Sequence, residues 1–325
     1  MSRPALEVRD LATHFTTRAG VLKAVDGVSF DLAQGEVVGL VGESGSGKTV
    51  TGFSILGLVD PPGRIVRGSV KLAGQELVGL APRGLRTLRG RKIAMVFQDP
   101  MTTLNPVLTI GRQMQLAILA HESAGAAVVR DRSVVALGRV GIPDAHRRLD
   151  AYPHEFSGGM RQRVAIAIAL LHRPDVIVCD EPTTALDVSI QAQILIEMKS
   201  LVRDLGTALI WIGHDLATVS SLASRVLVMY AGRIIEEGPT AAVLRSPFHP
   251  YTRGLLDSLP SRSEPGRDLA QIPGSTPSLL RLPEGCAFRS RCPRATETCI
   301  AAPPLERIGV RAYRCHHPLA AEIAA

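Results

Sequence analysis

Aromatic residues and long hydrophobic runs are both scarce in this chain. Phe, Trp and Tyr make up 4% of its 325 residues, which disfavours a surface that binds nucleic acid by stacking bases on aromatic rings. The longest uncharged apolar runs, Val164–Leu171 and Thr207–Gly213, are far shorter than the ~20 residues that cross a membrane. Residues 1–10 carry interspersed charges and no apolar signal core. These absences predict a cytoplasmic globular protein.

The net charge of +7 at pH 7 does not by itself indicate a nucleic-acid partner. The basic residues are mostly dispersed, and the densest group, from Arg83 to Lys92, contains no aromatic side chain. Such a group is typical of a solvated or membrane-proximal face. We therefore expect no nucleic-acid binding.

Cysteine is rare until the C-terminal part of the chain. Cys179 lies alone in an apolar run and is expected to be a small core residue. The remaining cysteines are Cys286, Cys292, Cys299 and Cys315. In a reducing cytoplasm, such clustering favours a metal centre over disulfides. The tight C-x₂₋₄-C knuckles of structural zinc sites are absent from the sequence. The wide spacing favours an iron–sulfur cluster whose irons lie apart, with Zn²⁺ or free thiols as alternatives; His316 or His317 could replace one ligand or be ordinary surface residues.

One stretch fits the G-x-x-x-x-G-K-[ST] pattern of a phosphate-binding loop. It is Gly42-Glu43-Ser44-Gly45-Ser46-Gly47-Lys48-Thr49. It follows the apolar run Val37–Val41 and precedes a predicted helix from about Thr49 to Leu58. Glycines let backbone N–H groups surround phosphate oxygens, and a helix start adds partial positive charge. Lys48 would reach the β- and γ-phosphates of ATP, and Thr49 would offer its hydroxyl to Mg²⁺.

A second apolar run, Val176–Cys179, ends in two carboxylates. Beside a phosphate-binding loop, Asp180 would hold Mg²⁺ and Glu181 would act as general base on the attacking water. The alternative is an ordinary solvated strand end.

The hydrophobic pattern predicts an α/β fold. Short alternating segments near the N-terminus predict an antiparallel layer, and the stretch from about 100 to 172 predicts a helical insert. Strands that alternate with helices after the insert imply parallel crossovers. The predicted strands beyond the antiparallel layer are Glu36–Val41, Ile93–Phe97, Val176–Cys179, Ala208–Ile212, Arg225–Tyr230 and Arg233–Glu237. From Ser246 onward the chain is rich in proline and predicts a loop-rich tail.

Several further segments resemble the motifs of ATP-binding cassette (ABC) ATPases, in the right order from Leu6 to about Gly238. These are an adenine-stacking aromatic at Phe15, the Q-loop glutamine Gln98, the signature loop Phe156-Ser157-Gly158-Gly159-Met160, the D-loop Ala185-Leu186-Asp187 and the switch histidine His214. Taken alone, His214 could be a structural histidine and Phe15 a packing residue. Met160 departs from the glutamine usual in the signature loop, which we interpret as a mark of subtype.

The resemblance implies a P-loop ABC nucleotide-binding domain with a RecA-like core, an antiparallel β layer and a helical subdomain. We expect this ABC domain over residues 1–245, with the helical subdomain at about 100–172. Gln98, Glu181 and His214 would be catalytic, and Thr49, Gln98 and Asp180 would hold Mg²⁺. ATP would lie between Gly42–Thr49 and the Ser157, Gly158 and Gly159 loop of a second ABC subunit in a head-to-tail dimer.

The region 246–325 looks like the C-terminal extension of ATP-binding subunits from bacterial dipeptide and oligopeptide importers. Relatives in this subfamily carry a 4Fe-4S cluster there. The resemblance implies import of peptides, with nickel or glutathione as alternative cargo. Its partners would be a second, heteromeric ABC subunit, two transmembrane permeases and an extracytoplasmic peptide-binding protein, and its place the cytoplasmic face of the inner membrane. A soluble ABC ATPase acting on nucleic acid or ribosomes, or an iron–sulfur redox sensor, is the remoter alternative.

Overall fold

The computed structural model describes residues 3–184, 186–259 and 270–319. The chain divides into two compact units. One, here called the phosphate-loop unit, comprises residues 6–32 and 37–78 together with the described chain from residue 211 onward. The other, here called the helical unit, comprises residues 33–36 and 79–210 with the first described residues of the chain.

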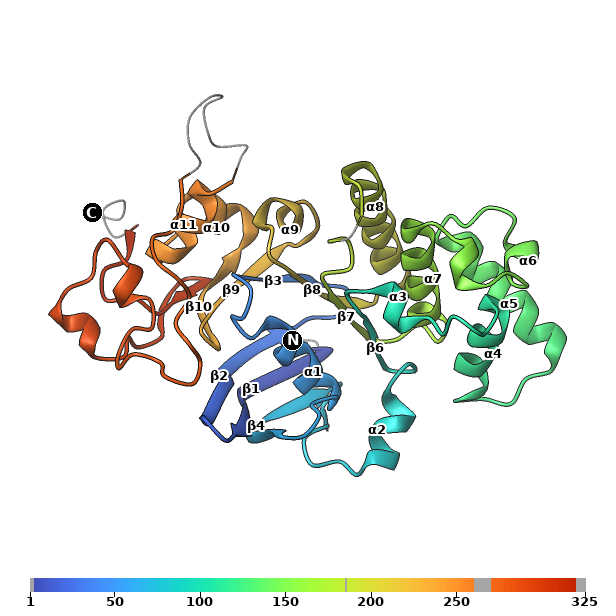
Figure 1. Cartoon of the computed structure of the whole chain (residues 1–325), viewed down its shortest axis with the longest axis horizontal. Helices are drawn as coiled ribbons and strands as arrows, with labels where there is room; N and C mark the ends of the chain where they lie inside the picture. The colour runs from blue at the N-terminus through green and yellow to red at the C-terminus, as the bar shows by residue number, and fades with distance from the viewer. Residues whose placement is uncertain (1–2, 185, 260–269, 320–325) are drawn as a thin grey trace. The chain divides into compact units, whose positions relative to one another are not determined.

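An antiparallel sheet forms one layer of the phosphate-loop unit, with the strand order β2-β1-β4-β5 (Figure 1). Its strands are β1 (Leu6–Thr17), β2 (Gly20–Leu32), β4 (Gly63–Leu72) and β5 (Gln75–Glu76). Helix α1 (Lys48–Leu56) packs on this sheet, where the hydroxyls of Thr13 and Ser54 form a buried hydrogen bond of 2.7 Å. This layer is the antiparallel layer that the sequence predicts.

A second group of strands in this unit runs in the order β11-β12-β10-β9-β3. The strands are β3 (Val37–Val41), β9 (Arg225–Tyr230), β10 (Arg233–Pro239), β11 (Glu306–Ile308) and β12 (Arg311–Tyr313). β3 and β9 pair in parallel, whereas the other pairs are antiparallel. The remaining helices of this unit are α9 (Leu216–Leu222), α10 (Thr240–Arg245), α11 (Pro250–Asp257) and the 3₁₀ turns Arg289–Arg291 and Glu297–Ile300. The tail thus adds two short strands to the edge of β10.

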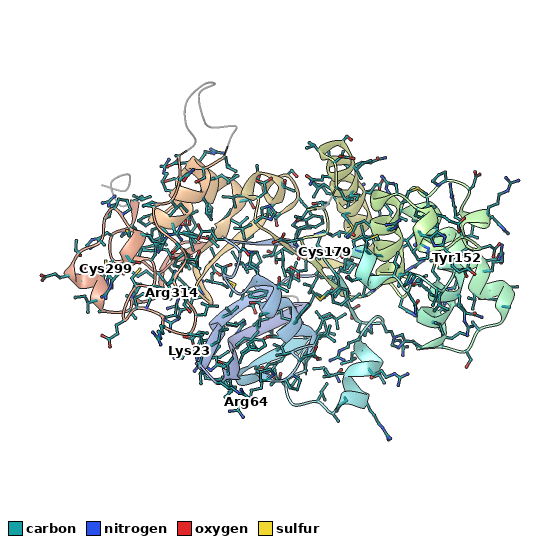
Figure 2. All side chains as sticks on the ribbon, viewed as in Figure 1. Lys23, Arg64, Tyr152, Cys179, Cys299 and Arg314 are labelled. Carbon is teal, nitrogen blue, oxygen red and sulfur yellow. The ribbon has the colours of Figure 1, made fainter. Side chains whose placement is uncertain are left out.

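The helical unit contains the parallel pair β6 (Ile93–Val96) and β7 (Val176–Asp180), and the start of β8 (Ala208–Gly213). β7 is wholly buried and apolar up to its last residue, as expected for a strand covered on both faces. The helices are α2 (Pro82–Leu88), α3 (Pro100–Thr103), α4 (Ile110–Leu119), α5 (Ala126–Arg139), α6 (Ala145–Arg148), α7 (Gly158–Leu170) and α8 (Val188–Leu205), with a 3₁₀ turn at Pro153–Glu155. Figure 2 labels Cys179 in this unit, and it is a buried core residue as predicted.

The predicted strands and helices around the motifs are confirmed to within a few residues. β1 is longer than predicted and includes Phe15, because it pairs with both β2 and β4 and so continues past the first alternating segment. α2 was not predicted, and neither were the short helices and strands of the tail. Within the described ranges, no helix is long and apolar enough to span a membrane.

Candidate functional site

The glycine-rich loop connects β3 to α1 in the phosphate-loop unit, as its sequence predicts. Gly42 has φ 155° and Gly47 has φ 105°. A Cβ at Gly42 would clash with the carbonyl oxygen of Met229, and one at Gly47 with that of Ala24. Only glycine fits both positions, so the loop backbone is fixed by its neighbours as well as by its own sequence.

Lys48 is 5% exposed and donates hydrogen bonds into its own loop. Its Nζ lies 2.8 Å from the carbonyl oxygen of Gly42 and 2.9 Å from that of Glu43. The Ser46 hydroxyl is buried and has no hydrogen-bond partner among the described residues. The two carbonyl contacts hold the Lys48 ammonium inside the loop, where a phosphate group can meet it.

Glu43 connects the loop to the tail through several hydrogen bonds. Arg291 donates from Nη1 and Nη2 to the two Glu43 carboxylate oxygens, at 2.7 and 2.9 Å. The Thr276 hydroxyl donates to the same carboxylate at 3.0 Å, and the Tyr251 hydroxyl accepts the backbone N–H of Glu43 at 2.8 Å. No sequence pattern points to these three tail residues as partners of the loop, because they lie more than 200 positions from it.

In the helical unit, Gln98 and Glu181 come together as the parallel pairing of β6 and β7 requires. Val96 is in register with Cys179, so the residues that follow both strands lie at the same sheet edge. Gln98 Nε2 lies 3.4 Å from Glu181 Oε2, to which the Thr184 hydroxyl also donates at 3.0 Å. Glu181 has φ 43°, in the left-handed region that non-glycine residues rarely adopt. Such strain is frequent at functional sites. Asp180, directly before it, is buried.

The signature-like loop opens α7 in the same unit. Ser157 is the N-cap residue, and its hydroxyl accepts the backbone N–H of Met160 at 3.3 Å. Ser157 and Gly158 are exposed, whereas Phe156 is buried and lies under the Arg148 guanidinium. A Cβ at Gly159 would press on Ile190 of α8. The exposed helix N-terminus is suited to an anion.

Three further predicted positions complete the set of motifs. His214 follows β8 and is exposed, directly before Asp215, which caps α9 by accepting the backbone N–H groups of Ala217 and Thr218. Phe15 is half-buried and its ring packs on Gly63, so it has a packing role whether or not it also stacks on a base. Ala185 of the predicted D-loop lies outside the described residues.

The four tail cysteines line one small cavity of about 10 Å³ together with His316 and His317. Cys299 is labelled in Figure 2. Burial, and to a smaller extent the neighbouring thiols, raises the pKa of Cys286 and of Cys292 above the ordinary value, and that of Cys315 to about 11. No group of three His, Cys, Asp or Glu side chains converges on a metal position in the part of the chain that the structure describes. The described structure therefore brings the four cysteines together but gives no support of its own for the predicted metal centre.

Known proteins were compared with this chain at the level of family, sequence and fold. The ABC transporter family matches residues 25–184, and the family "Oligopeptide/dipeptide transporter, C-terminal region" matches residues 235–299. The oligopeptide transport ATP-binding protein OppD of Salmonella typhimurium is 48% identical over 97% of this chain and 94% of its own. The dipeptide transport ATP-binding protein DppD of Haemophilus influenzae is 47% identical over 97% and 96%. The chain belongs to the ATP-binding subunits of ABC transporters.

Solved structures agree with this assignment. The ATP-binding cassette MJ0796, solved as a dimer bound to ADP and Pi, has a TM-score of 0.65 and 26% identity, covering 72% of this ABC subunit and 98% of its own chain. The predicted P-loop ABC ATPase fold and the predicted ATPase activity are thereby confirmed.

Proposed function

We propose that this ABC subunit hydrolyses ATP to energise the import of dipeptides or oligopeptides through a membrane transporter. The observation that carries the proposal is the similarity, at 48 and 47% identity, to named oligopeptide and dipeptide transport ATP-binding proteins along nearly the whole chain. Because it extends through the tail, the similarity is not limited to motifs that all ABC ATPases share.

The proposed roles of the site residues follow from their chemistry. Gly42–Thr49 would bind the triphosphate through backbone N–H groups and the Lys48 ammonium. Thr49, Gln98 and Asp180 offer the oxygen ligands that Mg²⁺ prefers, and bound Mg²⁺ would neutralise charge on the phosphates. Glu181 would take a proton from water as that water attacks the γ-phosphorus, breaking the bond to ADP and releasing phosphate. Its hydrogen bonds from Gln98 and Thr184 orient its carboxylate for that task.

The exposed N-terminus of α7 supports a proposed head-to-tail dimer. Ser157, Gly158 and Gly159 would bind the γ-phosphate of an ATP held by a second ABC subunit, and that subunit would do the same in return. ATP would then join the two subunits, and loss of the γ-phosphate would release them. His214 would contact the γ-phosphate and Phe15 would stack on adenine.

We further propose the setting in which this subunit works. It would associate with two transmembrane permeases and a second, heteromeric ABC subunit at the cytoplasmic face of the membrane, with an extracytoplasmic protein delivering the peptide. Residues 1–245 would form the ABC domain, with its helical subdomain at about 100–172, and 246–325 the extension that marks the peptide-importer subfamily.

Uptake measurements test the cargo. Cells or vesicles containing the complete transporter should take up labelled dipeptides or oligopeptides in an ATP-dependent manner, and a strain lacking this subunit should not. Uptake of nickel or glutathione without peptide uptake would overturn the peptide proposal while leaving the ATPase in place. ATP hydrolysis stimulated by DNA or RNA instead of by permeases would overturn the transporter proposal.

We propose a 4Fe-4S cluster in the tail on the basis of the cysteine spacing and of the one cavity that the four cysteines line. Four thiols line one space, although among the described residues no three ligand side chains meet at a metal position. Cys286, Cys292, Cys299 and Cys315 could ligate the separate irons of a 4Fe-4S cluster, provided that the loops part to widen the cavity. Buried thiols with raised pKa values stay protonated in isolation, and bound iron would stabilise them as thiolates. A bound cluster would hold the loops of the tail together.

Spectra of protein purified without oxygen test the cluster. We expect a brown protein with iron and sulfide in about equal amounts, as a 4Fe-4S composition requires. Cys292→Ser should remove most of the colour, whereas Cys179→Ser, in the core of the helical unit, should leave it. A colourless protein with stoichiometric zinc would overturn the cluster in favour of zinc.

A further inference from the structure

Several contacts other than the one with Glu43 hold the Arg291 side chain in place. It is 6% exposed. Its Nε donates to the carbonyl oxygen of Pro273 at 2.8 Å, and its Nη1 also lies 3.3 Å from the Tyr230 hydroxyl. The guanidinium lies 5.9 Å from the ring centres of both Tyr230 and Phe288. A planar guanidinium with these partners presents its remaining donors in one direction, as a bidentate contact to a carboxylate needs.

Tyr251 is fixed through a buried carboxylate. Glu236 is fully buried, and its two oxygens accept the backbone N–H groups of Phe248 and His249 at 2.8 and 2.9 Å. His249 then caps α11 by accepting the N–H of Tyr251 at its Nδ1, and burial lowers the pKa of His249 to about 3, which keeps that ring nitrogen unprotonated. These bonds fix the backbone at the start of α11, and the rings of Tyr230 and Phe288 pack on the Tyr251 ring at centroid distances of 4.5 and 5.4 Å.

The negative charge of Glu43 explains why the loop needs a cationic partner such as Arg291. Burial alone would raise the pKa of its carboxyl, but the hydrogen bonds from Arg291 and Thr276 and the charges of Arg291 and Lys48 outweigh burial and lower it. Glu43 is thus ionised within a loop whose ligand carries several negative charges. Unless it is neutralised, this carboxylate would repel a triphosphate.

We propose that Arg291 and Tyr251 are positioning residues through which the C-terminal tail sets the shape and charge of the phosphate-binding loop. Arg291 neutralises the Glu43 carboxylate, and Tyr251 fixes the backbone at the start of the loop. Neither residue touches ATP. The inference rests on the proposed role of Gly42–Thr49 in binding ATP. Because Arg291 directly precedes Cys292, it also connects the cysteine cavity to the nucleotide site.

A double-mutant cycle in the assembled transporter tests this proposal, with the dissociation constant of a fluorescent ATP analogue as readout. Arg291→Ala should raise that constant by about 10-fold, in the range of coupled charge pairs. Glu43→Gln supplies the reference value for the second half of the cycle, because its loop carries no carboxylate. The double variant should bind nearly as Glu43→Gln does, because no carboxylate remains to repel the phosphates. Arg291→Lys, which keeps the charge with fewer contacts, should lie in between, and Tyr251→Phe should weaken binding modestly.

Arg67→Ala is the matched control, because Arg67 also makes a bidentate contact, to Asp10 on the surface of the same unit. It should leave the dissociation constant unchanged. If Arg291→Ala lowers the melting temperature but not ATP affinity, or if the double variant binds as weakly as Arg291→Ala, the proposal is wrong and Arg291 is only structural. Lys48→Ala separates failure of this proposal from failure of the proposed nucleotide site. If that variant binds ATP normally, Gly42–Thr49 is not the ATP site.

Discussion

Replacing Lys48 by alanine is expected to remove ATP binding. The ammonium would make charge-assisted hydrogen bonds to the β- and γ-phosphates, each worth about 1.5–3 kcal/mol. Loss of two such bonds weakens binding by about 10²-fold or more. The substitution also removes the donor to the Gly42 and Glu43 carbonyl oxygens, so the loop loses an internal support. Titration with a fluorescent nucleotide measures the effect.

Lys71→Ala provides the control for this substitution. Lys71 is an exposed residue of β4 in the same unit, so it tests whether any lost positive charge weakens binding. Its ATP affinity should equal that of the natural chain. Unchanged affinity in Lys48→Ala would refute the phosphate role of Lys48.

Glu181→Gln is expected to retain ATP binding while turnover falls by about 10²–10⁴-fold, the usual range for loss of a general base. Glutamine is nearly isosteric with glutamate and can still accept the hydrogen bond from the Thr184 hydroxyl, but it cannot take a proton from water. Because ATP would join two subunits, the variant should also accumulate as an ATP-bound dimer. Steady-state phosphate release and size-exclusion chromatography with ATP measure the two effects.

The control for Glu181 is Glu122→Gln, on the surface of the helical insert, which should turn over ATP normally. Normal turnover in Glu181→Gln would refute the role of Glu181 as general base. Weak ATP binding in that variant would instead indicate that Glu181 supports the fold of the site, since its strained backbone depends on the residues around it.

Motifs whose structure depends mainly on neighbouring residues in the sequence were predictable. Gly42–Thr49 was predictable as the loop between a strand and a helix because an apolar run precedes its glycines, and Val176–Cys179 was predictable as a buried strand because all of its residues are apolar. The juxtaposition of Gln98 and Glu181 also follows from parallel pairing.

Contacts of the tail could not be predicted in the same way. Its short helices and strands carry little periodicity, so their positions depend on tertiary partners such as Glu236. Nothing local to Arg291 indicates that its side chain meets Glu43, 248 positions away. The cysteine pattern indicated clustering correctly, since the four side chains line one cavity, but spacing alone did not decide whether they converge on a metal.

The pairing of β12 with β10 has a consequence for how such tails can vary. Glu236 and Glu237 of β10 are in register with Tyr313 and Ala312, so the tail covers backbone groups that would otherwise form an open sheet edge. Open edges invite pairing with other chains. A tail without its four cysteines would still be needed to close this edge. The cysteines can therefore be replaced more freely than the segment that forms β12 can be deleted.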